Sequence, residues 1–122
     1  MNMKTTIRAI GDATVVDVRG KIEIGDECAA LHELIIKQLG EGHKRIILNL
    51  ADVKYIDSSG LGVLVSAFTT MRKQGGELKL VNLTKNVHDL MQITKLYTIF
   101  DIKNDEAAAL SSFGQLVTAA AS

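Results

Sequence analysis

Several features that mark other protein classes are scarce or missing in this chain of 122 residues. There is one cysteine, Cys28, so no disulfide can form within the chain, which fits a reducing compartment. No apolar run approaches the length of a membrane-spanning helix, and residues 1–6 lack the apolar core of a signal peptide. We therefore expect a cytoplasmic protein without a membrane partner.

An excess of one charge is also absent, because 14 Lys and Arg residues balance 14 Asp and Glu residues. Binding to nucleic acid phosphates favours a basic excess, so this balance argues against nucleic acid as a direct partner. Aromatic residues make up only 4% of the chain, whereas 47% of it is hydrophobic. The core must therefore be built mainly from Leu, Ile and Val, in a chain of the size of one domain.

The residues that are present predict alternating strands and helices. Strands at 4–10 and 13–19 flank a Gly11-Asp12 turn, which is typical of a β-hairpin. After a connection at 21–24, the periodicity predicts a helix capped by Asp26 and ended by Gly40, a strand at 45–50 and a helix at 59–74. A strand at 77–82 and a helix at 84–91, capped by Thr84, are expected next. The chain then continues with a strand at 98–102 and a final helix, which is opened by Asn104 or Asp105 and has Leu110, Phe113 and Val117 facing inward.

This order of elements predicts a single α/β domain. We expect an N-terminal hairpin that leads into a mixed, mostly parallel sheet of four to five strands with about four helices. No internal repeat or linker divides the chain. Sites in such sheets tend to lie beyond the carboxyl ends of the strands, where Asp57 and Ser58 are placed.

The junction between the strand at 45–50 and the helix at 59–74 reads Tyr55-Ile56-Asp57-Ser58-Ser59-Gly60-Leu61-Gly62. A helix start leaves backbone N–H groups without partners and carries the positive end of the helix dipole. Two interpretations stay open: a serine caps the helix, or an exposed serine accepts a phosphate. Asp57 is a further candidate to accept a hydrogen bond from a nearby hydroxyl or backbone N–H and so hold the Ser58 loop in one shape.

Other kinds of site have little support in the sequence. His32, His43 and His88 lack the spacing of metal ligands, and we expect His32 on the outer face of its helix and His43 in solvent. Cys28 falls on the apolar face of its helix and is expected to be buried. Neither the Gly-x-Ser-x-Gly pattern of a nucleophile elbow nor a phosphate-binding Gly-x-x-x-x-Gly-Lys loop is present. We therefore expect no catalytic residue, metal or cofactor, with a serine hydrolase acting through Ser58 as an alternative that a serine-reactive probe would test.

Four motifs together resemble the anti-anti-sigma factors of the STAS domain family. In chain order they are Ile46-Ile47-Leu48-Asn49-Leu50, Val53, Ile56-Asp57-Ser58-Ser59-Gly60-Leu61-Gly62-Val63 and Gly75-Gly76-Glu77-Leu78. The Asp-Ser-Ser-Gly-Leu-Gly core after an apolar strand is fairly specific, and the later Gly-Gly strengthens it. The resemblance implies a STAS-like fold over residues 4–117, with residues 118–122 as a frayed tail.

The resemblance also implies a function. In that family a partner kinase, which is an anti-sigma factor with a histidine-kinase-like ATPase fold, phosphorylates the first serine of the motif, and a metal-dependent serine phosphatase reverses this. Carried over, the phosphorylated residue is Ser58 and not Ser59. The chain would then be a binding module, not an enzyme, whose unphosphorylated form binds the anti-sigma factor and releases a sigma factor for transcription. The residues expected at the partner are Glu23, Asp57, Ser59, Gly60, Gly62, Val63 and Ser66.

One segment departs from the family pattern. After the hairpin the family often reads Gly-Glu-Leu-Asp or Gly-Glu-Leu-Asn, whereas this chain reads Gly20-Lys21-Ile22-Glu23, with the charge at position 21 reversed. If this segment touches the kinase, the partner is expected to differ from the best-known one. STAS domains also serve in lipid-transport, anion-transport and stress-signalling assemblies, so a constitutive subunit of a larger complex is the alternative function. We expect a monomer or a weak dimer.

Overall fold

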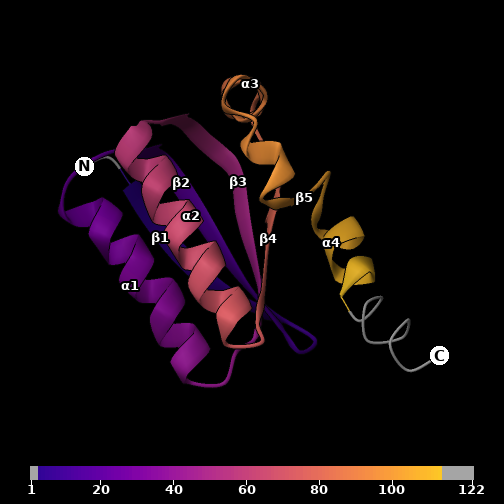
Figure 1. Cartoon of the computed structure of the whole chain (residues 1–122). Coiled ribbons are helices and arrows are strands. Elements are labelled where there is room, and N and C mark those ends of the chain that lie inside the picture. The colour runs from indigo at the N-terminus through magenta and orange to yellow at the C-terminus, as the bar shows by residue number, and fades with distance from the viewer. Residues whose placement is uncertain (1–2, 114–122) are drawn as a thin grey trace.

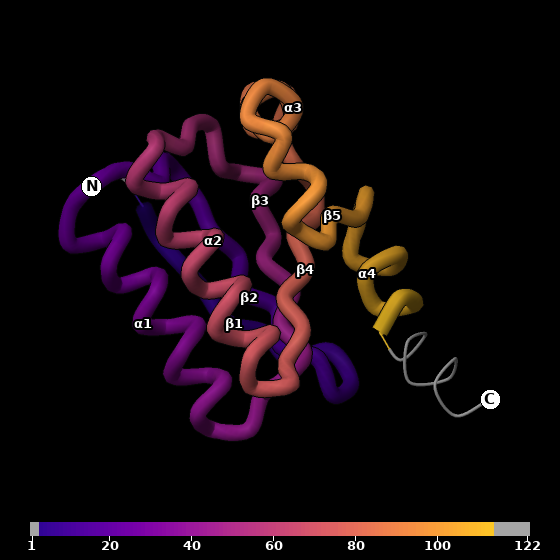
Figure 2. The backbone as a smooth tube through the Cα atoms, viewed as in Figure 1, coloured from indigo at the N-terminus to yellow at the C-terminus, as the bar shows by residue number. Residues whose placement is uncertain are grey.

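A computed structural model describes residues 3–113 of the chain. Its elements are β1 (Met3–Ile10), β2 (Ala13–Ile22), α1 (Asp26–Gly40), β3 (Arg45–Ile56), α2 (Ser58–Lys73), β4 (Glu77–Val81), α3 (Lys85–Thr94), the short 3-10 helix η1 (Leu96–Thr98), β5 (Asp101–Lys103) and α4 (Glu106–Ser112). Helices α1 and α2 lie side by side over one face of the sheet (Figures 1 and 2). Helix α4 packs on the opposite face.

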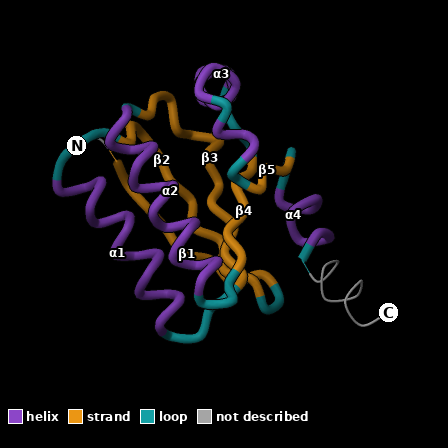
Figure 3. The backbone as a smooth tube through the Cα atoms, viewed as in Figure 1, coloured by secondary structure: helices purple, strands orange, loops and turns teal. Residues whose placement is uncertain are grey.

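The five strands form one sheet in the order β1-β2-β3-β4-β5. Strands β1 and β2 are antiparallel and turn at Gly11, whose φ of 60° is in the left-handed region that glycine adopts without strain. The pairs β2–β3, β3–β4 and β4–β5 are all parallel, with helices in the connections (Figure 3). The predicted α/β class, the hairpin and the mostly parallel sheet are confirmed.

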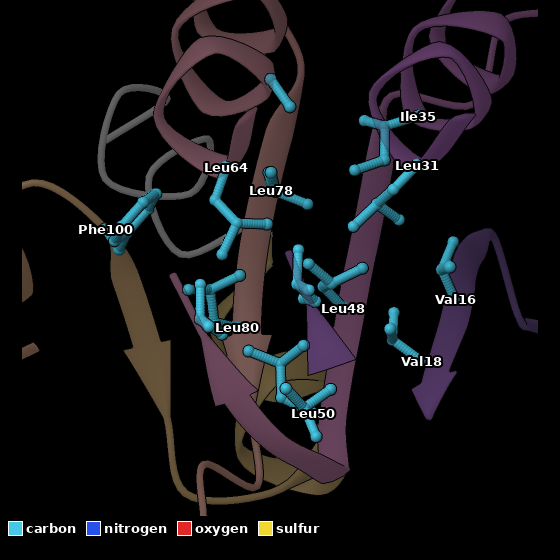
Figure 4. Packing of buried hydrophobic residues seen from close by; sticks show 14 of the residues in the cluster. Val16, Val18, Leu31, Ile35, Leu48, Leu50, Leu64, Leu78, Leu80 and Phe100 are labelled. Atoms are coloured by element: carbon cyan, nitrogen blue, oxygen red, sulfur yellow. The ribbon is translucent and has the colours of Figure 1, made fainter. Parts of the chain in front are cut away.

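The core has two layers because alternate side chains of each strand point to opposite faces of the sheet. Leu31 and Ile35 of α1 and Leu64 of α2 point toward Leu48 and Leu80 of the sheet (Figure 4). Each such side chain contributes about 1.5–3 kcal/mol on full burial. On the other face a smaller cluster joins the sheet to α4 through the residues Ala13, Val15, Ile47, Val81 and Ala109. Strand β3 is therefore covered on both faces, as its apolar middle predicts.

Two strands extend further than the sequence predicts. Ile22, expected in a connection, is fully buried at the end of β2, and β3 continues to Ile56. Alternation holds in β2, where Val16, Val18 and Ile22 face the same core cluster. It breaks in β3, which has one extra residue between Asn49 and Asp52 and another between Val53 and Tyr55 relative to β2. A bulge of this kind changes which side chains face the core.

The strand predicted at 98–102 is present but begins later than expected. Residues 96–98 form the 3-10 helix η1, and β5 starts only at Asp101. The backbone N–H groups of Ile99 and Phe100 both bond back to the carbonyl of Leu96, at 2.9 and 3.0 Å. Lys95, with a φ of 61°, ends α3 and turns the chain into this segment. The β-branched residues suggested a strand, but these local hydrogen bonds hold a turn.

The predicted helix caps have different outcomes. Asp105 caps α4 as expected, and its side chain accepts a backbone N–H bond. Asp26 is not a cap, because α1 begins after Gly25 without a side-chain cap. Thr84 stands at the cap position of α3, but its hydroxyl donates instead to the carbonyl of Val53, at 2.9 Å. Helix α3 is thereby attached to β3.

The last described residues agree with the predicted final helix. Leu110 and Phe113 are partly buried against the second core cluster. The predictions for Val117 and for a tail at 118–122 lie outside the described residues. In the described part of the chain, no helix has the length and hydropathy needed to cross a membrane.

Candidate phosphorylation and partner-binding site

Asp57 and Ser58 lie where the carboxyl end of β3 meets the start of α2. Asp57 is the N-cap residue, and its Oδ1 accepts a hydrogen bond from the backbone N–H of Gly60 at 2.7 Å. The interpretation of a serine as the cap is therefore wrong. Ser58 is the first residue of the helix and is exposed. Because Asp57 supplies the cap, the Ser58 hydroxyl is not needed for helix capping.

Asp57 also fixes the loop that precedes α1. Its Oδ2 accepts the backbone N–H of Ile24 at 2.9 Å, and its own N–H donates to the carbonyl of Ile22 at 3.1 Å. Both carboxylate oxygens are thus bonded to backbone, as the sequence interpretation of Asp57 proposed. This residue joins the end of β2, the loop after it and the start of α2.

These hydrogen bonds set the charge at the site. The N–H groups of Gly60 and then Ile24 lower the pKa of Asp57, so the carboxylate is ionised at neutral pH. Cys28 is buried below this loop, as predicted. Burial, and secondarily the charge of Asp57, raises the pKa of its thiol. Cys28 is therefore held as the less reactive thiol form.

Two glycines of the motif have different environments. A Cβ on Gly60 would lie 2.4 Å from the carbonyl oxygen of Ile22 and 2.9 Å from the side chain of Ile56. Gly60 is buried, so its missing side chain allows the start of α2 to pack on β2 and β3. A Cβ on Gly62 would meet nothing within 4 Å, and Gly62 is exposed. Of the two, Gly62 is therefore the one available to a partner, and Gly60 serves packing inside the chain.

A shallow groove of about 490 Å³ lies beside Ser58, between α1 and α2. Ser59, Gly62, Val63 and Ser66 line it from α2, and Ala29, His32 and Glu33 line it from α1. The Nε2 atom of His32 is 3.1 Å from the hydroxyl oxygen of Ser66. The expectation of His32 on the outer face of its helix was therefore wrong. Sequence reasoning missed the contribution of α1, although positions 29, 32 and 33 share the helical spacing that places them on one face.

The loop with the altered family motif belongs to the same end of the molecule. Glu23 is half-buried, and its neighbour Ile24 is 78% exposed and hydrogen-bonded to Asp57. Lys21, the position of the reversed charge, is exposed at the end of β2. We call the set Glu23, Ile24, His32, Ser58, Ser59, Gly62, Val63 and Ser66 the Ser58 surface. It contains six of the eight predicted site residues, with Asp57 and Gly60 supporting it from within.

The sequence of this chain matches a known family of domains. The family model of the STAS domain matches residues 4–109. The chain belongs to the STAS domain family. The anti-sigma-B factor antagonist of Bacillus subtilis is 35% identical to this STAS domain over 102 residues, which is 84% of this chain and 92% of the relative. That of Listeria monocytogenes is 38% identical over 91 residues, 73% of this chain and 77% of the relative.

Solved structures agree with this STAS fold. The crystal structure of TM1081 from Thermotoga maritima superposes with a TM-score of 0.76 at 26% identity, covering 88% of this chain and 92% of that one. The Bacillus cell fate determinant SpoIIAA in its phosphorylated form has a TM-score of 0.66 at 18% identity, covering 86% and 96% of the two chains. At that identity the second likeness shows the fold alone.

Within the described residues, no group of three or more His, Cys, Asp or Glu side chains is arranged so that it could hold a metal ion. His43 is exposed, as predicted. The chemistry available at the surface is that of one exposed hydroxyl beside an ionised carboxylate at a helix start.

Proposed function

We propose that this STAS domain is an anti-sigma factor antagonist that is switched by phosphorylation of Ser58. In its unphosphorylated form it binds an anti-sigma factor kinase and releases a sigma factor, and a serine phosphatase restores this form. One observation carries the proposal: the Ser58 hydroxyl is exposed on the first turn of α2, while Asp57 performs the capping. The relatives that are named anti-sigma factor antagonists support the choice of partner.

The Ser58 surface has the features of a protein contact. Gly62 leaves open space on the exposed side of α2, so a partner backbone can approach the helix closely. Val63 and the exposed Ile24 offer apolar contact, and Glu23 and His32 add polar groups. Protein interfaces combine apolar and polar groups of this kind.

Phosphorylation would change this surface and leave the fold intact. A phosphoserine adds roughly −1.5 to −2 charge at neutral pH. The start of an exposed helix favours an anion by about 0.3–1 kcal/mol, and Asp57 keeps its backbone hydrogen bonds. In a closed interface the same charge, next to ionised Asp57, would lack a partner and would cost several kcal/mol. A loss of about 2.7 kcal/mol already weakens binding roughly a hundredfold.

The experiment is a measurement of intact mass with peptide mapping, after incubation with ATP and an extract of the source cells. We expect one added phosphoryl group on Ser58, absent from Ser58→Ala and retained in the matched variant Ser59→Ala. If the extract phosphorylates other proteins but not this one, the proposal of a phosphorylation switch is wrong. A constitutive subunit of a larger assembly, with a tight partner and no modification, would then be the better account.

A further inference from the structure

A second groove lies at the other end of α2, away from Ser58. It has a volume of about 590 Å³, and its principal lining residues are Phe68 and Arg72 of α2, Leu78 of β4, and Ile99 and Phe100 of the segment before β5. Figure 1 shows this segment between α3 and β5, beside the β4 edge of the sheet. Phe68 and Arg72 follow Ser58 by 10 and 14 residues, which is about 15 and 21 Å along the helix axis. The groove also shares no lining residue with the groove beside Ser58, so the two sites are distinct.

The groove exists because β5 starts late. Strand β4 pairs with β5 only from Lys79 to Val81, so no strand of the described chain covers Glu77 and Leu78 on this edge. The turn at 96–100 instead places Ile99 and Phe100 at the groove, where Phe100 packs against Phe68 of α2. A cleft remains between the helix, the strand edge and the turn.

The walls of the cleft are apolar and well defined. Phe68 and Phe100 pack edge to face, with ring centroids 5.7 Å apart. Ile99 borders the same opening and is 45% exposed. The chain has only three phenylalanines, and two of them line this groove. Small-molecule sites are typically concave, of about 300–1,000 Å³, and apolar with few polar groups.

The charge of the groove is positive once the internal ion pairs are counted. Glu77 and Asp101 are among its lining residues, but both face the buried ammonium group of Lys79, which is hydrogen-bonded to Asp101 and lies 3.8 Å from Glu77 Oε1. Asp101 Oδ1 also lies 3.4 Å from the ammonium group of Lys103, so two ammonium groups balance the two carboxylates. Arg72 makes no ion pair with any other residue in the described range. Lys73 borders the hollow that continues the groove past Ile99. The free charge at the opening is therefore cationic.

We propose that this groove binds a small amphipathic carboxylate, an organic acid with an aliphatic or aromatic body. The body lies on Phe68 and Ile99, above the buried ring of Phe100, and the carboxylate pairs with the guanidinium of Arg72, which offers two parallel N–H donors. The proposal does not depend on Ser58 or on any protein partner.

The test uses the full chain labelled with ¹⁵N and titrated with octanoate up to about 10 mM, a range suited to weak binding. We expect saturable shifts of the backbone amide signals at Phe68, Arg72, Ile99 and Phe100. Octanamide, which has the same body without the charge, should bind the parent chain roughly tenfold more weakly than octanoate does. Octanoate should likewise bind the variant Arg72→Gln roughly tenfold more weakly than the parent chain. The matched control Arg19→Gln removes an exposed arginine elsewhere and should bind like the parent chain.

Four results would overturn the proposal. One is the absence of saturable shifts, and another is equal octanoate affinity in Arg72→Gln and the parent chain. The third is a shift of the amide signals of the groove residues when only the protein concentration changes, which would show that a second copy of the chain occupies the groove. The variant Ile99→Asp changes an exposed side chain, so it should fold normally and lose octanoate binding. Retained affinity in that variant would also contradict the site.

Discussion

At Ser58, the charge of a single side chain decides whether the proposed partner binds. We expect Ser58→Ala to bind the anti-sigma factor within about threefold of the parent chain, because it removes only an exposed hydroxyl. Ser58→Asp should bind at least roughly tenfold more weakly, since it places an uncompensated charge in the interface. Isothermal titration calorimetry with the purified partner measures both. Equal affinities for the two variants would show that charge is not the switch.

Gly60 and Gly62 provide a matched pair for separating packing from binding. Gly60→Ala puts a Cβ 2.4 Å from the carbonyl of Ile22, so we expect a loss of about 1–3 kcal/mol in unfolding free energy. Gly62→Ala meets open space and should gain up to about 1 kcal/mol from helix propensity. Urea unfolding of both variants measures these effects. Comparable stability of the two variants would mean that the start of α2 packs differently on β2.

At the scale of elements, Asp57 links the loop before α1 to the start of α2, and this link depends on its charge. The backbone hydrogen bonds hold the pKa of Asp57 below its ordinary value of 3.8. The stabilisation from Asp57 is therefore complete above that value and is lost as the pH falls through the lower pKa of the folded state.

The expected outcome concerns Asp57→Asn. Its amide oxygen can accept only one of the two backbone N–H bonds, so the variant should be less stable than the parent chain at pH 7. The difference should shrink as the pH falls below about 4, where the unfolded parent chain takes up a proton at Asp57, and should level off below the lower pKa of the folded state. Urea midpoints over this pH range measure it, with the exposed substitution Asp52→Asn as control. If the stability difference between Asp57→Asn and the parent chain does not change with pH, the role of Asp57 does not depend on its charge.

At the scale of the whole molecule, Arg8 connects the beginning of the chain with its last described helix. Its guanidinium bonds to Asp17 on β2 at 2.6 Å and to Glu106 on α4 at 2.7 Å. These partners, Asp17 first, raise the pKa of Arg8. Because the Arg8 side chain is 42% exposed, we expect Arg8→Gln to lower the free energy of unfolding by only about 1 kcal/mol. The loss should be smaller at high salt, which screens the charges. Thermal unfolding at two salt concentrations checks this, and a salt-independent loss would point to packing instead.

Local patterns predicted much of the fold and the centre of the site. The Gly11-Asp12 turn, the apolar stripe of α1 and the Asp57-Ser58 junction all depend on neighbours in sequence, so the sequence alone reveals them. Features that depend on distant contacts were missed. Val53 and Ile56 face the core because β3 carries extra residues relative to β2, and Ile99 lies in a turn because Leu96 accepts its N–H. His32 joins the Ser58 surface only because α1 packs beside α2.

The exposed position of Ser58 above a cap made by Asp57 also has a consequence for time. Because the carboxylate that shapes the loop is not the group proposed to be modified, adding a phosphate requires no refolding and stores no strain. Nothing within the domain then drives the phosphate off, and uncatalysed hydrolysis of phosphate monoesters is among the slowest reactions known. The lifetime of the phosphorylated, inactive state would then be set by how often a phosphatase encounters the domain. Under the proposed switch, the abundance of the phosphatase would determine how long the response lasts.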